Sequence, residues 1–136
     1  MVGIGLLAVC LVIALATFRM GWDVPALSGH EFRQAQTALS IQSMQQTGFK
    51  LDYETPVLGK PWSIPMEFPL YQLLVTQYTA ATGSEIAQAG RMVSVVGFLV
   101  GMVACFGLAR WLGFSIGASA LMIAPICLSP VYLFYS

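Results

Sequence analysis

Two long, uninterrupted runs of uncharged and mostly apolar residues limit most strongly what this chain can fold into. The first covers residues 2–18 and the second covers residues 92–109. As helices, runs of this length extend about 25–27 Å, close to the thickness of the hydrocarbon core of a membrane. Only 9% of the residues are charged, whereas soluble domains carry about 25%. The chain is therefore predicted to be an all-α, multi-pass integral membrane protein.

Three transmembrane helices are predicted, at about residues 2–18, 86–109 and 112–135. A cleaved signal peptide is the alternative for the first run, because Ala14-Leu15-Ala16 resembles a cleavage site. A retained span is favoured, since no Lys or Arg precedes this run and two more spans follow. The sequence ends directly after the third run, so we expect residues 1–136 to be the N-terminal portion of a longer protein, inactive alone.

Small residues within the apolar runs are interpreted as packing positions. Gly97 and Gly101, and likewise Gly113 and Gly117, form G-x-x-x-G patterns that allow helix backbones to approach closely. The cysteines are interpreted as small buried hydrophobic residues, because they form neither a disulfide framework nor a C-x-x-C pair. These are Cys10, Cys105 and Cys127.

Nearly all charged residues lie in a polar insert at about residues 19–85, which forms the long first loop. Ser28 and Glu31 fit the S-x-x-E capping box that opens a helix, and Gly48 is a natural end for that helix. Its apolar residues are too few and too small for a buried core, so it is predicted to lie at the membrane interface. A second interfacial helix is predicted from Leu70 to Gly83, after a proline-rich segment that favours extended structure.

The orientation of the loop is not decided by charge. Five of the six Lys and Arg residues lie in or beside the insert, which alone would place it in the cytoplasm. That rule is reliable only for loops shorter than about 60 residues, and this insert is longer.

The first candidate site is formed by His30, Glu31 and Arg33, and two interpretations stay open there. In one, Glu31 only completes the capping box, His30 is an interfacial side chain and Arg33 meets lipid phosphate. In the other, the Glu31 carboxylate is a general base for an acceptor hydroxyl and the Arg33 guanidinium binds a phosphate.

The second candidate site is formed by Lys60, Glu67, Tyr71 and Arg91. Prolines stiffen the loop that carries Lys60 and Glu67, which lowers the entropy lost in holding them in place. Arg91 lies within the second span, where an ionisable residue indicates a site by default, although snorkelling to the interface also explains it.

Other classes of site are not indicated. The sequence contains no P-loop, G-x-G-x-x-G, H-E-x-x-H or G-x-S-x-G motif, and its single His makes a zinc site a poor expectation. The formal net charge is zero, which gives no reason to expect a nucleic-acid partner. No cofactor or metal is predicted.

The order of these pieces resembles the N-terminal part of integral-membrane glycosyltransferases with the GT-C fold. Family 39-like members, akin to protein O-mannosyltransferases and aminoarabinose lipid A transferases, are the most similar. The resemblance covers nearly the whole chain. It rests on His30-x-x-Arg33-Gln34-x-x-Thr37-Ala38, on Glu67-x-Pro69-Leu70-Tyr71 and on Gly90-Arg91, in that order and spacing.

The resemblance implies transfer of a sugar from a polyprenyl-phosphate donor to a lipid, glycan or protein acceptor at the extracytoplasmic surface. A bacterial inner membrane is expected. Glu31 is the implied catalytic acid, with Asp23 as an alternative because the register is open, and Glu67 as a second acid. The implied substrate-binding residues are His30, Arg33, Gln34, Lys60, Tyr71 and Arg91. The alternative function is a non-catalytic membrane subunit or transporter fragment whose polar loop binds a partner.

Overall fold

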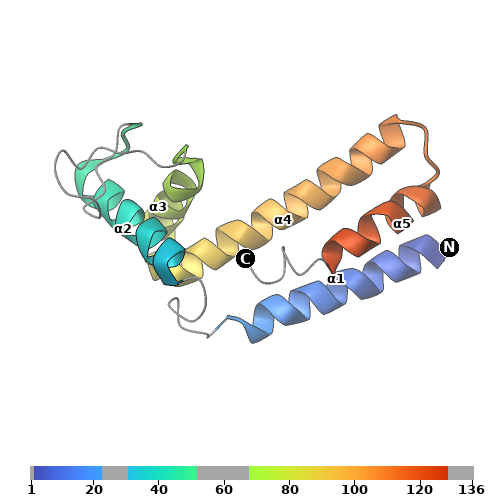
Figure 1. Ribbon diagram of the computed structural model, residues 1–136, viewed down its shortest axis with the longest axis horizontal. Coiled ribbons are helices and arrows are strands. Elements are labelled where there is room, and N and C mark those ends of the chain that lie inside the picture. The colour runs from blue at the N-terminus through green and yellow to red at the C-terminus, as the bar shows by residue number, and fades with distance from the viewer. Residues whose placement is uncertain (1, 23–30, 52–67, 129–136) are drawn as a thin grey trace. The chain divides into compact units, whose positions relative to one another are not determined.

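The computed structural model describes residues 2–22, 31–51 and 68–128. Five α-helices and no strand occur among them. Figure 1 labels these helices. The helices are α1 (Val2–Met20), α2 (Glu31–Thr47), α3 (Leu70–Thr82), α4 (Ile86–Trp111) and α5 (Ile116–Cys127). The chain divides into one unit of residues 1–23 and 94–136 and another of residues 24–93, with α4 contributing to both. The prediction of an all-helical chain is confirmed.

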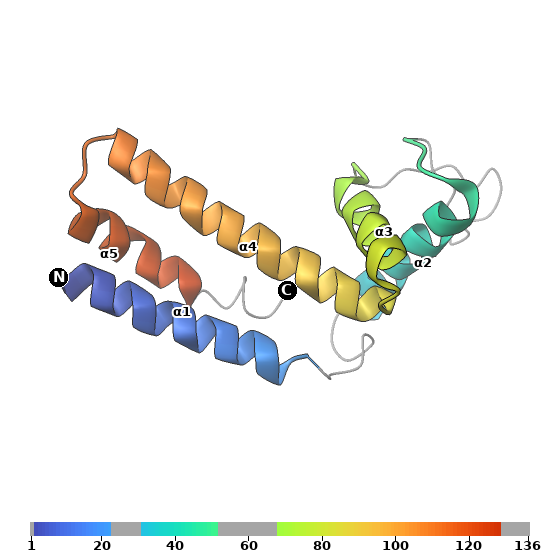
Figure 2. The ribbon, with the colours of Figure 1, turned by 180° about the vertical axis from the view of Figure 1, so that it is seen from behind.

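The first unit joins α1, α5 and the longer part of α4. The helices α1 and α5 pack side by side, as both views show (Figures 1 and 2). A buried cluster lies between the three helices, and the rings of Phe18 and Phe98 meet edge to face with centroids 5.7 Å apart. The buried members are Cys10, Ala14, Phe98, Met102, Ile123, Ala124 and Cys127. The interpretation of the cysteines is thus confirmed for Cys10 and Cys127 but wrong for Cys105, which is exposed.

Close approach of α1 to α5 depends on Gly3. A Cβ atom built on Gly3 would lie 2.3 Å from the carbonyl oxygen of Gly117, so no larger residue fits without moving a backbone. The prediction that Gly97 and Gly101 pack against a helix is wrong for the described residues, because a Cβ at either position meets nothing within 4 Å. Of the two G-x-x-x-G patterns, only Gly117 makes a close helix contact.

Gly113 ends α4 instead of packing a helix. Its φ of 88° is in the left-handed region, which glycine adopts without steric cost. Its N–H donates to the Arg110 carbonyl at 3.0 Å, and the Phe114 N–H donates to the Ala109 carbonyl at 3.2 Å. This pair of bonds is the Schellman motif that closes a helix C-terminus.

The helix in the third apolar run therefore begins later in the sequence than predicted. The helix α5 begins at Ile116, where the Ser115 side chain caps it by accepting from the Ala118 N–H at 3.2 Å. Its 12 residues extend about 18 Å, less than the roughly 30 Å of a hydrocarbon core. Residues 129–135 of the predicted span lie outside the described residues.

Among the described residues, two helices are long and apolar enough to cross a membrane, namely α1 and α4. Large apolar side chains on both are exposed, among them Val12 on α1 and Val100 and Val103 on α4. Such surfaces are unfavourable in water and normal against lipid. The chain is thus a candidate membrane protein with two candidate spans.

The second unit pairs α2 with α3, and the first turns of α4 pack against them (Figure 2). Ile41 of α2, Val75 of α3 and Ala89 of α4 form its buried cluster. The expectation that α2 contributes no buried core is wrong, because Ile41 and Met44 are 2% and 3% exposed. Their spacing of three residues places both side chains on one face of the helix, and Ile41 packs against Val75 of α3.

The predicted C-terminal ends of α2 and α3 are confirmed. The N–H groups of Gly48 and Gly83 donate to the carbonyls of Met44 and Thr79, four residues back, at 3.0 and 2.8 Å. Both glycines have positive φ, 80° and 69°, which closes each helix with a left-handed residue. Ser28, which would form the predicted capping box of α2, lies outside the described residues.

Candidate functional site

The structure describes the side chains of three predicted site residues: Gln34, Tyr71 and Arg91. Asp23, His30, Lys60 and Glu67 lie outside the described residues. Glu31 and Arg33 are described as backbone in the first turn of α2. Gln34 follows on the same helix with an exposed side chain. The predicted cluster around Glu31 therefore stays a prediction.

One hydrogen bond joins two pieces of the predicted motif. The Tyr71 hydroxyl on α3 donates to the backbone carbonyl of Gly90 on α4, with 3.0 Å between the oxygens. A Cβ atom built on Gly90 would also lie 3.0 Å from the Tyr71 hydroxyl oxygen. Glycine at this position leaves the space in which the phenol reaches the helix backbone, so the last residue of "EFPLY" contacts the first residue of "GR".

Arg91 follows this contact in the second turn of α4 and is half-buried. The next charged residue is Arg110, so the two arginines bracket the uncharged residues 92–109. That stretch extends about 27 Å as a helix, which places Arg91 and Arg110 near opposite boundaries of a hydrocarbon core if α4 crosses it. A helical side chain leans toward the N-terminus, so the Cα–Cβ bond of Arg91 is tilted toward the start of α4.

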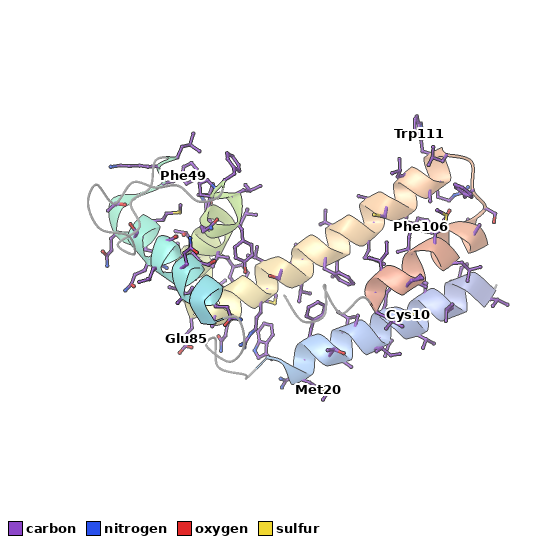
Figure 3. All side chains as sticks on the ribbon, in the orientation of Figure 1. Cys10, Met20, Phe49, Glu85, Phe106 and Trp111 are labelled. Carbon is purple, nitrogen blue, oxygen red and sulfur yellow. The ribbon has the colours of Figure 1, made fainter. Side chains whose placement is uncertain are left out.

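The link between α3 and α4 is short. Residues 83–85 join the two helices, and Figure 3 shows Glu85 at the start of α4. Three residues span at most about 11 Å, so α3 ends close to the level at which α4 begins. On α3, Leu70 and Leu74 are exposed, and the neighbouring Phe68 is exposed as well.

The contact between α2 and α3 is partly polar. The Gln45 side-chain N–H donates to the Thr79 hydroxyl at 2.9 Å, and that hydroxyl donates to the Thr76 carbonyl at 2.8 Å. The Ser40 hydroxyl, also buried, donates to the Gln36 carbonyl at 2.9 Å. The Gln45–Thr79 bond joins α2 to α3, whereas the other two bonds satisfy buried hydroxyls within their own helices.

Gln72 is a buried polar residue that the sequence reasoning missed. Its side chain is 4% exposed, and its Oε1 accepts no hydrogen bond from any described residue. Gln72, Val75 and Thr79 are the buried residues of α3. Their spacing of three and then four residues is the helical signal that could have identified this face.

Among the described residues, no group of three His, Cys, Asp or Glu side chains is placed to hold a metal ion. The described part of the site therefore consists of the cation of Arg91, the Tyr71–Gly90 contact and the apolar end of α3. This arrangement can hold an anionic headgroup at the end of a helix that is long enough to cross a membrane.

Comparison with known proteins adds no relative. No family model, no curated protein and no solved structure matches the chain. The resemblance to GT-C glycosyltransferases accordingly stays a prediction from the sequence.

Proposed function

We propose that this chain is the N-terminal portion of a membrane glycosyltransferase that moves a sugar from a polyprenyl-phosphate carrier to an acceptor. In this proposal α1, α4 and the run containing α5 cross the membrane, and α2 and α3 lie at its extracytoplasmic surface. The short link from α3 to α4 supports the interfacial position, as do the exposed apolar residues Leu70 and Leu74. A polyprenyl-phosphate donor presents its phosphate at that same depth.

The single observation behind the proposal is the Tyr71–Gly90 hydrogen bond of 3.0 Å. Two motif pieces that lie 19 residues apart in the sequence are in contact, and the contact adjoins Arg91. A guanidinium at the membrane boundary is suited to a lipid phosphate, because its planar donors match phosphate oxygens bidentately.

The proposed reaction is a displacement at the anomeric carbon of the sugar. The carboxylate of Glu31, or of Asp23 or Glu67, takes the proton of the acceptor hydroxyl as its oxygen attacks. The bond between the anomeric carbon and the phosphate oxygen breaks, and polyprenyl phosphate leaves with the electron pair. Arg33, Lys60 and Arg91 bind the donor phosphate, which is an anion before and after this bond breaks. A single displacement inverts the anomeric centre.

Replacement of Arg91 tests this proposal, with Arg110 as a matched control at the other end of α4. Sugar transfer is measured with the protein in its native length, in proteoliposomes, with a radiolabelled polyprenyl-phosphate sugar as donor. We expect Arg91→Ala to reduce kcat/KM about 10–100-fold, because a charge-assisted contact to phosphate is lost. Arg110→Ala is expected to retain wild-type transfer.

Equal activity of the two variants contradicts the proposed role of Arg91. If the wild-type protein transfers no sugar from any polyprenyl-phosphate donor, the transferase proposal is wrong. A non-catalytic subunit whose loop binds a partner then becomes the better description.

A further inference from the structure

Gly90 differs from the other glycines of α4, because a described neighbour lies where its side chain would be. Glycine is the weakest helix former after proline, and α4 contains four, at positions 90, 97, 101 and 107. A Cβ atom at 97, 101 or 107 meets nothing within 4 Å, whereas at 90 it lies 3.0 Å from the Tyr71 hydroxyl oxygen. At that separation the neighbouring atom must give way by a few tenths of an ångström, so alanine at 90 shifts the Tyr71 hydroxyl.

The Tyr71–Gly90 contact also fixes how α4 is rotated about its own axis relative to α3. Ala89 is fully buried in the cluster with Ile41 and Val75. The backbone carbonyl of the adjacent Gly90 accepts the hydrogen bond from the Tyr71 hydroxyl. Successive helical residues are turned by about 100°. Holding positions 89 and 90 against α3 therefore sets the direction in which the side chain of Arg91 leaves the helix.

We propose that Tyr71 and Gly90 are positioning residues, which hold the Arg91 guanidinium in register with the phosphate of the lipid-linked donor. The inference rests on the proposed function and assigns Tyr71 a role through Arg91 instead of direct contact with the substrate. It makes the two motif pieces parts of one structural element, because a change in either residue alters the Tyr71–Gly90 contact.

The kinetic test compares Gly90→Ala with Gly97→Ala, which makes the same substitution in the same helix where a Cβ has open space. Gly90→Ala is expected to raise KM for the polyprenyl-phosphate donor about tenfold with little change in kcat, since Arg91 binds the phosphate in the ground state and the transition state alike. Gly97→Ala is expected to leave both parameters at wild-type values.

A double variant separates displacement of the phenol from other effects of a methyl group. Tyr71→Phe lacks the hydroxyl that the new Cβ would meet, so Gly90→Ala combined with Tyr71→Phe should show the KM of Tyr71→Phe alone. If the double variant has a higher KM than Tyr71→Phe alone, or if Gly97→Ala is as impaired as Gly90→Ala, the positioning role is refuted.

Labelling of position 91 tests the same inference without enzyme activity. Arg91→Cys is made in a variant whose three native cysteines are replaced by alanine, and its reaction with a methanethiosulfonate reagent is timed. Adding Gly90→Ala should change that rate several-fold, while adding Gly97→Ala should not. An unchanged rate with Gly90→Ala overturns the positioning role, whereas a changed rate in a protein without transferase activity overturns only the proposed function.

Discussion

Glu31 is the residue on which the proposed chemistry depends most directly, and the structure places it at the first position of α2. A carboxylate there is favourable beside the positive end of the helix dipole. The capping-box role requires only a hydrogen-bond acceptor, which a Gln side chain also provides, whereas a general base requires a group that takes a proton. The two interpretations therefore differ in what a neutral amide can replace.

We expect Glu31→Gln to lower sugar transfer about 100-fold or more, since loss of a general base costs that much. The measurement is transfer from the polyprenyl-phosphate donor, with heat resistance of the purified variant as a check on folding. Glu85→Gln is the matched control, because Glu85 is an exposed acid beside the start of α4. It should transfer sugar at the wild-type rate.

Wild-type turnover by Glu31→Gln means that Glu31 serves only the helix. Asp23→Asn and Glu67→Gln then identify which of the other two acids takes the proton. Loss of activity in all three variants would point instead to a set of carboxylates that act together.

At the scale of elements, sequence patterns predicted where most helices begin and end. The glycines at 48 and 83 close α2 and α3 as expected, since a left-handed residue after a helix is a local requirement. The pattern did not reveal which glycines make contacts between helices. Gly97 and Gly101 look like a packing motif, but a Cβ atom at either position would meet nothing within 4 Å, while Gly3, outside any such motif, lies against Gly117.

Gly3→Ala is predicted to destabilise the pairing of α1 with α5. The added methyl would lie 2.3 Å from the Gly117 carbonyl oxygen, which is backbone and cannot rotate away. Overpacking of this kind costs about 1–3 kcal/mol, so the midpoint of thermal unfolding should fall. The measurement is loss of helical circular dichroism on heating in detergent micelles.

Gly5→Ala is the control on the same helix, because a Cβ at Gly5 meets nothing within 4 Å. It should keep the wild-type midpoint or raise it slightly, since alanine is the better helix former. Equal loss in both variants would contradict a specific contact at Gly3.

At the scale of the whole molecule, the proposal requires the two ends of α4 to lie on opposite sides of a membrane. Gln46 on α2 and Leu112 after α4 are both exposed and provide one reporter for each side. In intact cells producing a cysteine-free variant, Gln46→Cys should react with a membrane-impermeant maleimide, and Leu112→Cys should react only after the cells are opened. A single cysteine in place of Ser63 should behave like that at position 46.

The reverse pattern would place the long loop in the cytoplasm, as the count of positive charges alone suggests. Reaction of both cysteines from outside would contradict the assignment of α4 as a span.

The sequence by itself determined the helical architecture, because the features involved are local. Apolar runs of membrane length predicted α1 and α4, and glycines predicted the ends of α2 and α3. The beginning of α5 was not predicted correctly. A Schellman turn at Gly113 interrupts the third apolar run, and this turn cannot be recognised from the composition of the run. Arg91 was also found from the sequence, because a charge at the edge of an apolar run is visible there.

Only the tertiary structure decided which helix faces meet. The contact of Tyr71 with Gly90, the burial of Gln72 and the approach of Gly3 to Gly117 each depend on how two helices are rotated against each other. The sequence pattern of a helix shows which residues share a face, but it does not show which other helix packs against that face. The physical reason is that packing energy depends on the shapes of both surfaces, and each is assembled from residues far apart in the chain.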